Sequence, residues 1–74
     1  MNGINVNLLK AKLVERGLNV TALADMIKID RSTLYRKLQE NGINITVGEA
    51  NAIVIALGLS VQEAVAIFFS NKVA

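Results

Sequence analysis

Basic and hydroxyl side chains are concentrated in one short segment near the middle of the chain. Seven consecutive positions hold six of them: Arg31, Ser32, Thr33, Tyr35, Arg36 and Lys37. An arginine guanidinium can donate two hydrogen bonds to one guanine base, and hydroxyl and ammonium groups bind phosphate oxygens. The segment therefore indicates non-covalent recognition of a nucleic acid.

Residues for covalent or metal chemistry are missing from the rest of the sequence. The chain has no Cys and no His, which excludes disulfides, zinc fingers and Cys or His nucleophile–base pairs. Its six carboxylates are scattered, so no acid–base pair can be nominated. We expect neither an enzyme nor a bound metal, cofactor or small-molecule ligand.

Two short helices about a tight turn would position the basic segment. Asn19 and Asp30 stand where helix N-caps are needed, since each has a side-chain oxygen that can accept the unpaired N–H groups of a first turn. The second helix begins so soon after the first that Lys28 and the residue after it must turn the chain. The pattern predicts a helix-turn-helix at about residues 19–40, whose second helix can enter the DNA major groove.

The apolar residues of the second helix determine which side of it is exposed. Leu34 and Leu38 are spaced i, i+4 and should face the core. At about 100° per residue, Ser32 and Arg36 then point away from the core. The predicted base-reading residues are Arg31, Ser32 and Arg36, with Tyr35 placed to touch a base methyl or a phosphate.

Other polar residues are expected at the phosphate backbone. Thr33 and Lys37 flank the readout face, Thr21 lies in the first turn of the first motif helix, and Asn44 follows the second helix. Amide groups at a helix N-terminus favour anions, which supports Thr21. An ordinary solvated basic helix face is the alternative for an isolated helix, and the preceding capped helix and turn favour DNA.

The 74 residues predict one domain, 1–74, with five helices. The first covers about residues 7–16 and ends at Gly17, and the motif helices cover 20–27 and 31–39. After an extended segment at 43–45, two capping boxes, Thr46 to Glu49 and Ser60 to Glu63, open the last two helices; Gly58 closes the first of these.

The expected core is aliphatic, because only three residues of the chain are aromatic. From the first helix we expect Leu9, Leu13 and Val14 to face inward. From the fourth helix we expect Val47, Ala50, Ile53, Val54 and Leu57, and from the fifth Val61, Ala64, Val65 and Phe68. Phe68 and Phe69 point about 100° apart, so one of them should be exposed at a partner surface or form a half-buried rim.

Charge is distributed unevenly between the two halves of the chain. Residues 1–37 carry seven Lys and Arg against three Asp and Glu, a net +4, and residues 38–74 carry one against three, a net −2. A basic half suits a surface presented to phosphates. The absence of Cys and of an N-terminal signal pattern predicts a cytoplasmic location.

The sequence resembles the lambda-repressor-like family, the Cro/repressor type of helix-turn-helix domain found in phage and bacterial regulators. The resemblance runs from about Leu8 to Phe69 and is carried by Leu23-Ala24, by residues 29–38, by Gly48-Glu49-Ala50 and by residues 56–60. It implies an all-α, compact five-helix domain that binds operator DNA, usually as a dimer on a pseudo-palindrome. Two positions depart from the family: Lys28 stands where Gly is common, and Val20 where Gln is common.

Together these features predict a sequence-specific transcriptional regulator, a phage repressor or Cro-like protein acting at operator DNA in a bacterial host. A homodimer through Phe68 or Phe69 of the last helix is expected, and no membrane association. The alternative is a protein-interaction module of the same fold, such as an antitoxin, antirepressor or assembly factor.

Overall fold

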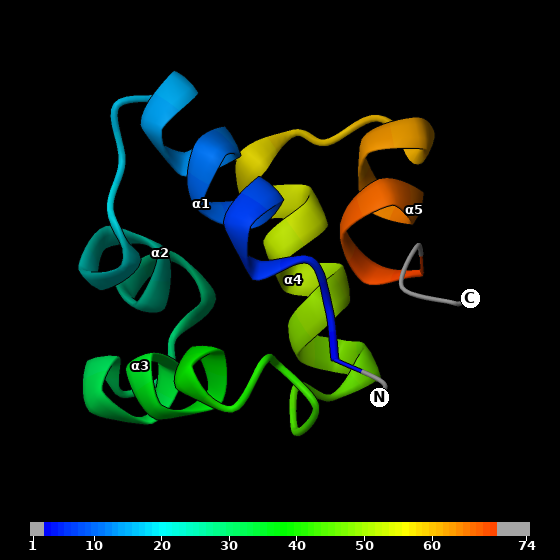
Figure 1. The fold of residues 1–74 in the computed structure, drawn as a ribbon. Coiled ribbons are helices and arrows are strands. Elements are labelled where there is room, and N and C mark those ends of the chain that lie inside the picture. Colours follow the sequence, from blue (N-terminus) through cyan, green and yellow to red (C-terminus); the bar gives the residue numbers. More distant parts are fainter. Residues whose placement is uncertain (1–2, 70–74) are drawn as a thin grey trace.

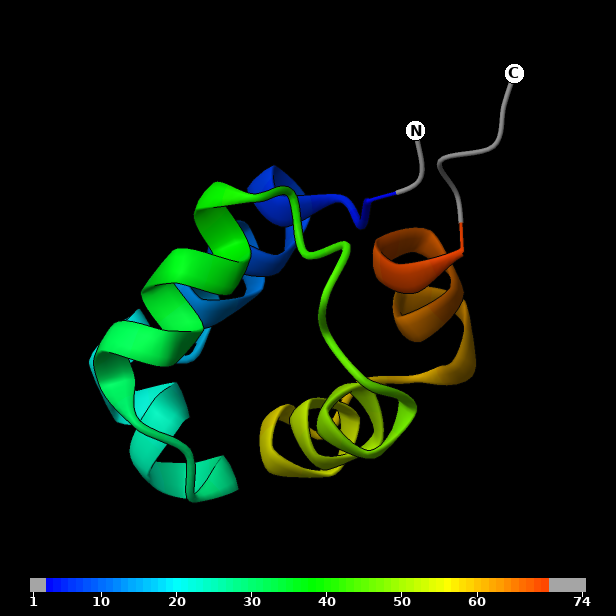
Figure 2. The ribbon, with the colours of Figure 1, turned by 90° about the horizontal axis from the view of Figure 1, so that it is seen from below.

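The computed structural model describes residues 3–69, which form five α-helices and no strand. They are α1 (Val6–Glu15), α2 (Val20–Ile27), α3 (Arg31–Gln39), α4 (Val47–Leu57) and α5 (Val61–Phe68). The helices α2 and α3 lie at one end of the molecule and α5 at the other, with α4 between them (Figures 1 and 2). The predicted all-α fold is confirmed, and no helix in residues 3–69 is long and apolar enough to cross a membrane.

Local capping explains where the helices begin. The Asn19 side chain accepts a hydrogen bond from the Ala22 amide at 2.8 Å, so α2 begins where it was predicted. Both predicted capping boxes are present at the starts of α4 and α5. The first helix begins one residue earlier than predicted, because Asn5 caps it by accepting from the Leu8 amide.

The turn of the predicted helix-turn-helix has the left-handed conformation that favours glycine. Lys28 adopts φ 65° and ψ 42° directly after α2. A β-carbon makes this conformation costly. The tight turn is therefore present, and Lys28 adopts a strained backbone conformation in it.

Eleven apolar side chains form one core shared by all five helices: Leu9, Leu13, Val20, Leu23, Ala24, Leu34, Leu38, Ile53, Leu57, Leu59 and Ile67. Val20 belongs to this core. Its apolar side chain, 7% exposed, contributes to the packing of α2 against the other helices.

Several residues expected in the core are exposed instead. Val14, Val47 and Val61 are each at least 75% exposed, and Val65 is also exposed. The buried residue of α5 is Ile67, and a helix that turns Ile67 inward turns Val61 and Val65 outward. Val47 and Val14 lie in the first turn of α4 and the last turn of α1, where the core does not reach them. Ala50, Val54, Ala64 and Phe68 are only partly buried.

The segment expected to be extended at residues 43–45 begins in a turn that covers residues 40–44. Asn41 and Gly42 both have positive φ, which folds the chain back after α3. A β-carbon on Gly42 would lie 2.6 Å from Ile4, and the Ile4 amide donates to the Asn41 carbonyl at 2.7 Å. The N-terminal segment therefore holds this turn against the body of the domain.

Candidate nucleic-acid interface

The exposed face of α3 has the composition that the sequence predicted. Leu34 and Leu38 are buried, whereas Arg31, Ser32, Tyr35 and Arg36 are exposed. α3 lies along one edge of the molecule (Figure 2), so this face is open to a partner. We call Arg31, Ser32, Tyr35 and Arg36, together with Thr21 of α2, the recognition face.

Asp30 organises the start of the recognition face. Its Oδ2 accepts from the amides of Ser32 at 3.0 Å and Thr33 at 3.2 Å, and from the Ser32 hydroxyl. These hydrogen bonds, the Ser32 hydroxyl first, hold the pKa of Asp30 below its usual value. Because the Ser32 hydroxyl donates its proton to Asp30, its oxygen is left to act as an acceptor toward a partner.

Two predicted contact residues from different helices lie together. The hydroxyl oxygens of Thr21, in the first turn of α2, and Tyr35, in the middle of α3, are 3.4 Å apart. Thr33, in the first turn of α3, is partly buried, and its backbone amide donates to the Asp30 cap. The contact joins the two motif helices by a pair of hydroxyls that also offers hydrogen bonds to a phosphate.

Lys37 is engaged inside the protein. Its Nζ lies 2.8 Å from both carboxylate oxygens of Glu49, in the first turn of α4. The Lys37 and Glu49 side chains are 15% and 21% exposed. The Lys37 ammonium holds the pKa of Glu49 below its usual value. The phosphate contact predicted for Lys37 stays a prediction, and it would have to compete with this ion pair.

Asn44 is likewise occupied, although it is exposed. Its side-chain amide donates to the Glu40 carboxylate at 3.0 Å. The contact ties Asn44 back to the first residue after α3 and leaves the second N–H of its side-chain amide to donate a further hydrogen bond. The backbone contact predicted for Asn44 also stays a prediction.

Two further basic residues, Lys12 in α1 and Arg16 directly after it, are held by Glu63 of α5. Glu63 accepts from Lys12 at 2.9 Å and lies 3.9 Å from Arg16, whose Nε donates to the Leu57 carbonyl at 2.6 Å. Glu63 in turn raises the pKa of Lys12. Within residues 3–69 the cations without an ion pair are Lys10, Lys28, Arg31 and Arg36, and the last three belong to the motif.

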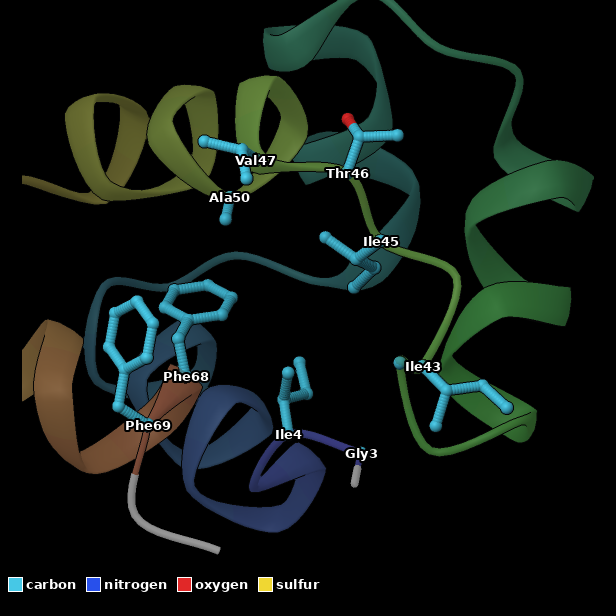
Figure 3. A pocket seen from close by; sticks show the side chains of 10 residues that line it. Gly3, Ile4, Ile43, Ile45, Thr46, Val47, Ala50, Phe68 and Phe69 are labelled. Carbon is cyan, nitrogen blue, oxygen red and sulfur yellow. The ribbon is translucent and has the colours of Figure 1, made fainter. Parts of the chain in front are cut away.

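A second exposed surface, on α4 and α5, is apolar. Val61, Val65 and Phe69 are spaced i, i+4 and i+8 and are all exposed, and Val47 of α4 is 88% exposed. We call Val47, Val61, Val65 and Phe69 the apolar face. Beside it is a groove in which Phe68 and Phe69 lie opposite Val47 and Ala50 (Figure 3). Phe68 is partly buried and Phe69 is 74% exposed, as expected for adjacent residues on a helix.

Spacing along the chain does not reveal the contacts of Glu49 and Glu63 with basic residues. The sequence identifies both acids as capping-box residues, and they are. The second partner of each acid comes from another helix, twelve or more positions away. The sequence does indicate that each carboxylate is fixed at the third position of its helix by a capping box. A carboxylate held in this way can still accept a hydrogen bond from a basic side chain of another helix.

The arrangement of the helices, the tight turn and the exposed basic face define a helix-turn-helix domain. Residues 8–68 match the family of Cro/C1-type HTH DNA-binding domains, and the chain belongs to this family. Neither curated proteins nor solved structures gave a match to the chain. The family supports DNA as the ligand and a DNA-binding regulator as the class of protein, a class that is not typically enzymatic.

Proposed function

We propose that this protein is a sequence-specific transcriptional regulator, a phage repressor or Cro-like protein that occupies operator DNA and blocks polymerase. The observation that carries the proposal is the recognition face, which presents two unpaired arginines on a helix whose opposite side is buried. Family membership supports DNA as the ligand. Residues at the start of the second helix of such motifs meet base edges.

The hydrogen-bonding state of each side chain suggests its role. Arg31 and Arg36 have no ion pair and are suited to bidentate contacts with guanine. Ser32 presents an acceptor, which matches the amino group of adenine or cytosine. Thr21, Thr33 and Tyr35 would contact phosphates. Lys37 and Asn44 are held by acids and stand outside this set.

The apolar face supports the homodimer. A dimer places two recognition helices on two half-sites about one helical turn of DNA apart, and it needs a self-complementary patch. Val47, Val61, Val65 and Phe69 supply exposed apolar surface that a second copy of the chain could cover. The second copy is the occupant we propose for this face.

Replacement of one arginine tests the proposal. A duplex selected by the wild-type protein from random sequences serves as the probe. We expect Arg36→Ala to weaken binding to it roughly 5- to 150-fold, equivalent to about 1–3 kcal/mol for one bidentate contact. Lys10→Ala is the matched control, because Lys10 is an exposed, unpaired cation outside the motif. Equal binding by wild type and Arg36→Ala would overturn the operator-binding proposal.

The exposed groove also favours the second candidate, a protein-interaction module such as an antitoxin, antirepressor or assembly factor. The two candidates differ in their response to salt. Phosphate contacts give a steep dependence of binding on salt concentration. Absence of salt-dependent retention on any duplex would leave the interaction module as the better proposal.

A further inference from the structure

We propose that Glu49 limits sequence-independent binding to DNA by holding the Lys37 ammonium away from phosphates. This inference rests on the proposed DNA-binding function and deepens it. It assigns a specificity-determining role to an acidic residue outside the helix-turn-helix motif.

Glu49 is held in place from two sides. Its Oε1 accepts from the Thr46 amide at 3.0 Å, and its own amide donates to the Thr46 hydroxyl at 3.0 Å. The same carboxylate binds Lys37 through both oxygens. A carboxylate anchored in the first turn of a helix cannot follow a lysine that swings outward, so a phosphate contact by Lys37 requires the ion pair to break.

The ion pair between Lys37 and Glu49 is better shielded than a surface pair. Both side chains are mostly buried, and the hydrogen-bonded Lys37 ammonium lowers the pKa of Glu49. Exposed pairs contribute little because water and salt screen them. Partial burial and two short contacts make this pair a stronger competitor for the ammonium.

Keeping Lys37 away from the phosphates matters because a contact of its charge with a phosphate would not discriminate between DNA sequences. Lysine acts as a point charge, whereas arginine matches base edges by its planar geometry. Each phosphate contact steepens the log–log dependence of DNA affinity on salt by about 0.9, whatever the sequence. With Lys37 held by Glu49, the unpaired cations of the motif are Lys28, Arg31 and Arg36. Specific contacts then account for a larger share of the affinity.

The test measures binding to a random-sequence duplex as a function of salt. Glu49→Gln removes the charge but keeps a residue that suits a capping box. We expect the variant to bind this duplex several-fold more tightly at 0.1 M salt, with a slope steeper by about 0.9. Its preference for the selected operator over random DNA should fall.

Variants of Lys37 separate this effect from a general change in charge. Lys37→Gln alone should leave the slope of the wild type unchanged, because the proposed role keeps Lys37 off the DNA. Glu49→Gln together with Lys37→Gln should return the slope to the wild-type value. Thermal unfolding of each variant checks that it is folded.

The proposal is overturned if Lys37→Gln alone makes the slope shallower, or if the gain of Glu49→Gln persists without Lys37. Because Lys37→Gln leaves the capping box intact, it remains decisive even if Glu49→Gln does not fold. If folded Glu49→Gln has an unchanged salt slope and Arg36→Ala still binds the selected duplex more weakly than the wild type, this inference is refuted. The operator-binding proposal then still holds. A wild type without salt-dependent binding refutes both.

Discussion

The recognition face and the apolar face are both exposed, and they differ in how nearby charges are arranged. Around the recognition face, Lys28, Arg31 and Arg36 have no ion pair in the described part of the chain. In the half that carries the apolar face, Glu49 and Glu63 hold Lys37 and Lys12 from other helices. The net charge of +2 therefore understates how strongly unpaired positive charge is concentrated on one side.

The way each helix is capped accounts for this difference. The motif helices α2 and α3 are capped by Asn19 and Asp30, with no acidic residue in the first turn of either helix. The helices α4 and α5 use capping boxes, which place a glutamate at the third position. A glutamate fixed in this way binds its own cap and a cation from a neighbouring helix. The choice of cap thus determines which cations remain unpaired.

The largest expected effect concerns the apolar face. Phe69→Glu places a charge in the proposed dimer contact, and we expect at least about a 30-fold weaker self-association, as for the loss of a central interface residue. Because Phe69 is 74% exposed, the fold should persist. Sedimentation measures the oligomeric state, and binding to the selected operator should weaken in parallel.

A conservative variant provides the control for this prediction. Phe69→Leu keeps an apolar side chain and should associate more strongly than Phe69→Glu. If the wild type is a monomer at every concentration tested, or if Phe69→Glu associates as the wild type does, then the apolar face is not a contact between copies of this chain.

Acid should loosen the junction of α1 and α5. Hydrogen bonding to Lys12 and to the Ser60 amide lowers the pKa of Glu63 from 4.5 to about 2. A group with a lowered pKa in the folded state stabilises the protein above its unfolded pKa, and the stabilisation is lost as pH falls through the folded pKa. We therefore expect the urea midpoint to fall between about pH 5 and pH 2.

Glu63→Gln isolates this contribution, since glutamine keeps the capping-box geometry and does not titrate. The variant should have a lower midpoint at pH 7 and a flatter dependence on pH. Asp30 and Glu49, whose pKa values are also lowered, should leave a residual slope. A pH dependence identical to that of the wild type would contradict the assignment to Glu63.

Loss of a cap in the motif should have a moderate effect. Asn19→Ala removes the acceptor for the Ala22 amide and should cost about 1 kcal/mol in the free energy of unfolding. Asn51→Ala is the control, because Asn51 is exposed within α4 and alanine is the better helix former. Urea unfolding measures both, and a neutral Asn19→Ala would show that the α2 cap contributes nothing.

The sequence predicted the motif half more accurately than the other half. The bounds of α2 and α3 follow from local signals, namely the caps at Asn19 and Asp30 and the spacing of Leu34 and Leu38. The same spacing placed Arg36 and Ser32 on the exposed side. Wherever polar and apolar positions alternate at the helical period, the buried side of a helix can be derived without the rest of the fold.

In α4 and α5 apolar residues occur on every side of the helix, so the helical spacing of apolar residues does not indicate which side is buried. The structure buries Ile53, Leu57 and Ile67 and exposes Val47, Val61 and Val65. The pairing of Lys37 with Glu49 depends on how α3 and α4 pack, which no local pattern specifies. The sequence could therefore predict which side of one helix is exposed, but it could not predict the contacts between helices.

The smallest expected effect tests the strained turn between α2 and α3. A left-handed conformation costs a residue with a β-carbon about 1–2 kcal/mol, and glycine loses about 0.5–1 kcal/mol of chain entropy on folding. Lys28→Gly should therefore stabilise the domain by about 0.5 kcal/mol, measured by urea unfolding. Lys28→Ala is the matched control, since it removes the same charge and keeps the strain, and it should bring no gain. If Lys28 is only a solvated turn residue, both variants keep the salt slope of DNA binding; a shallower slope in both would add Lys28 to the recognition face.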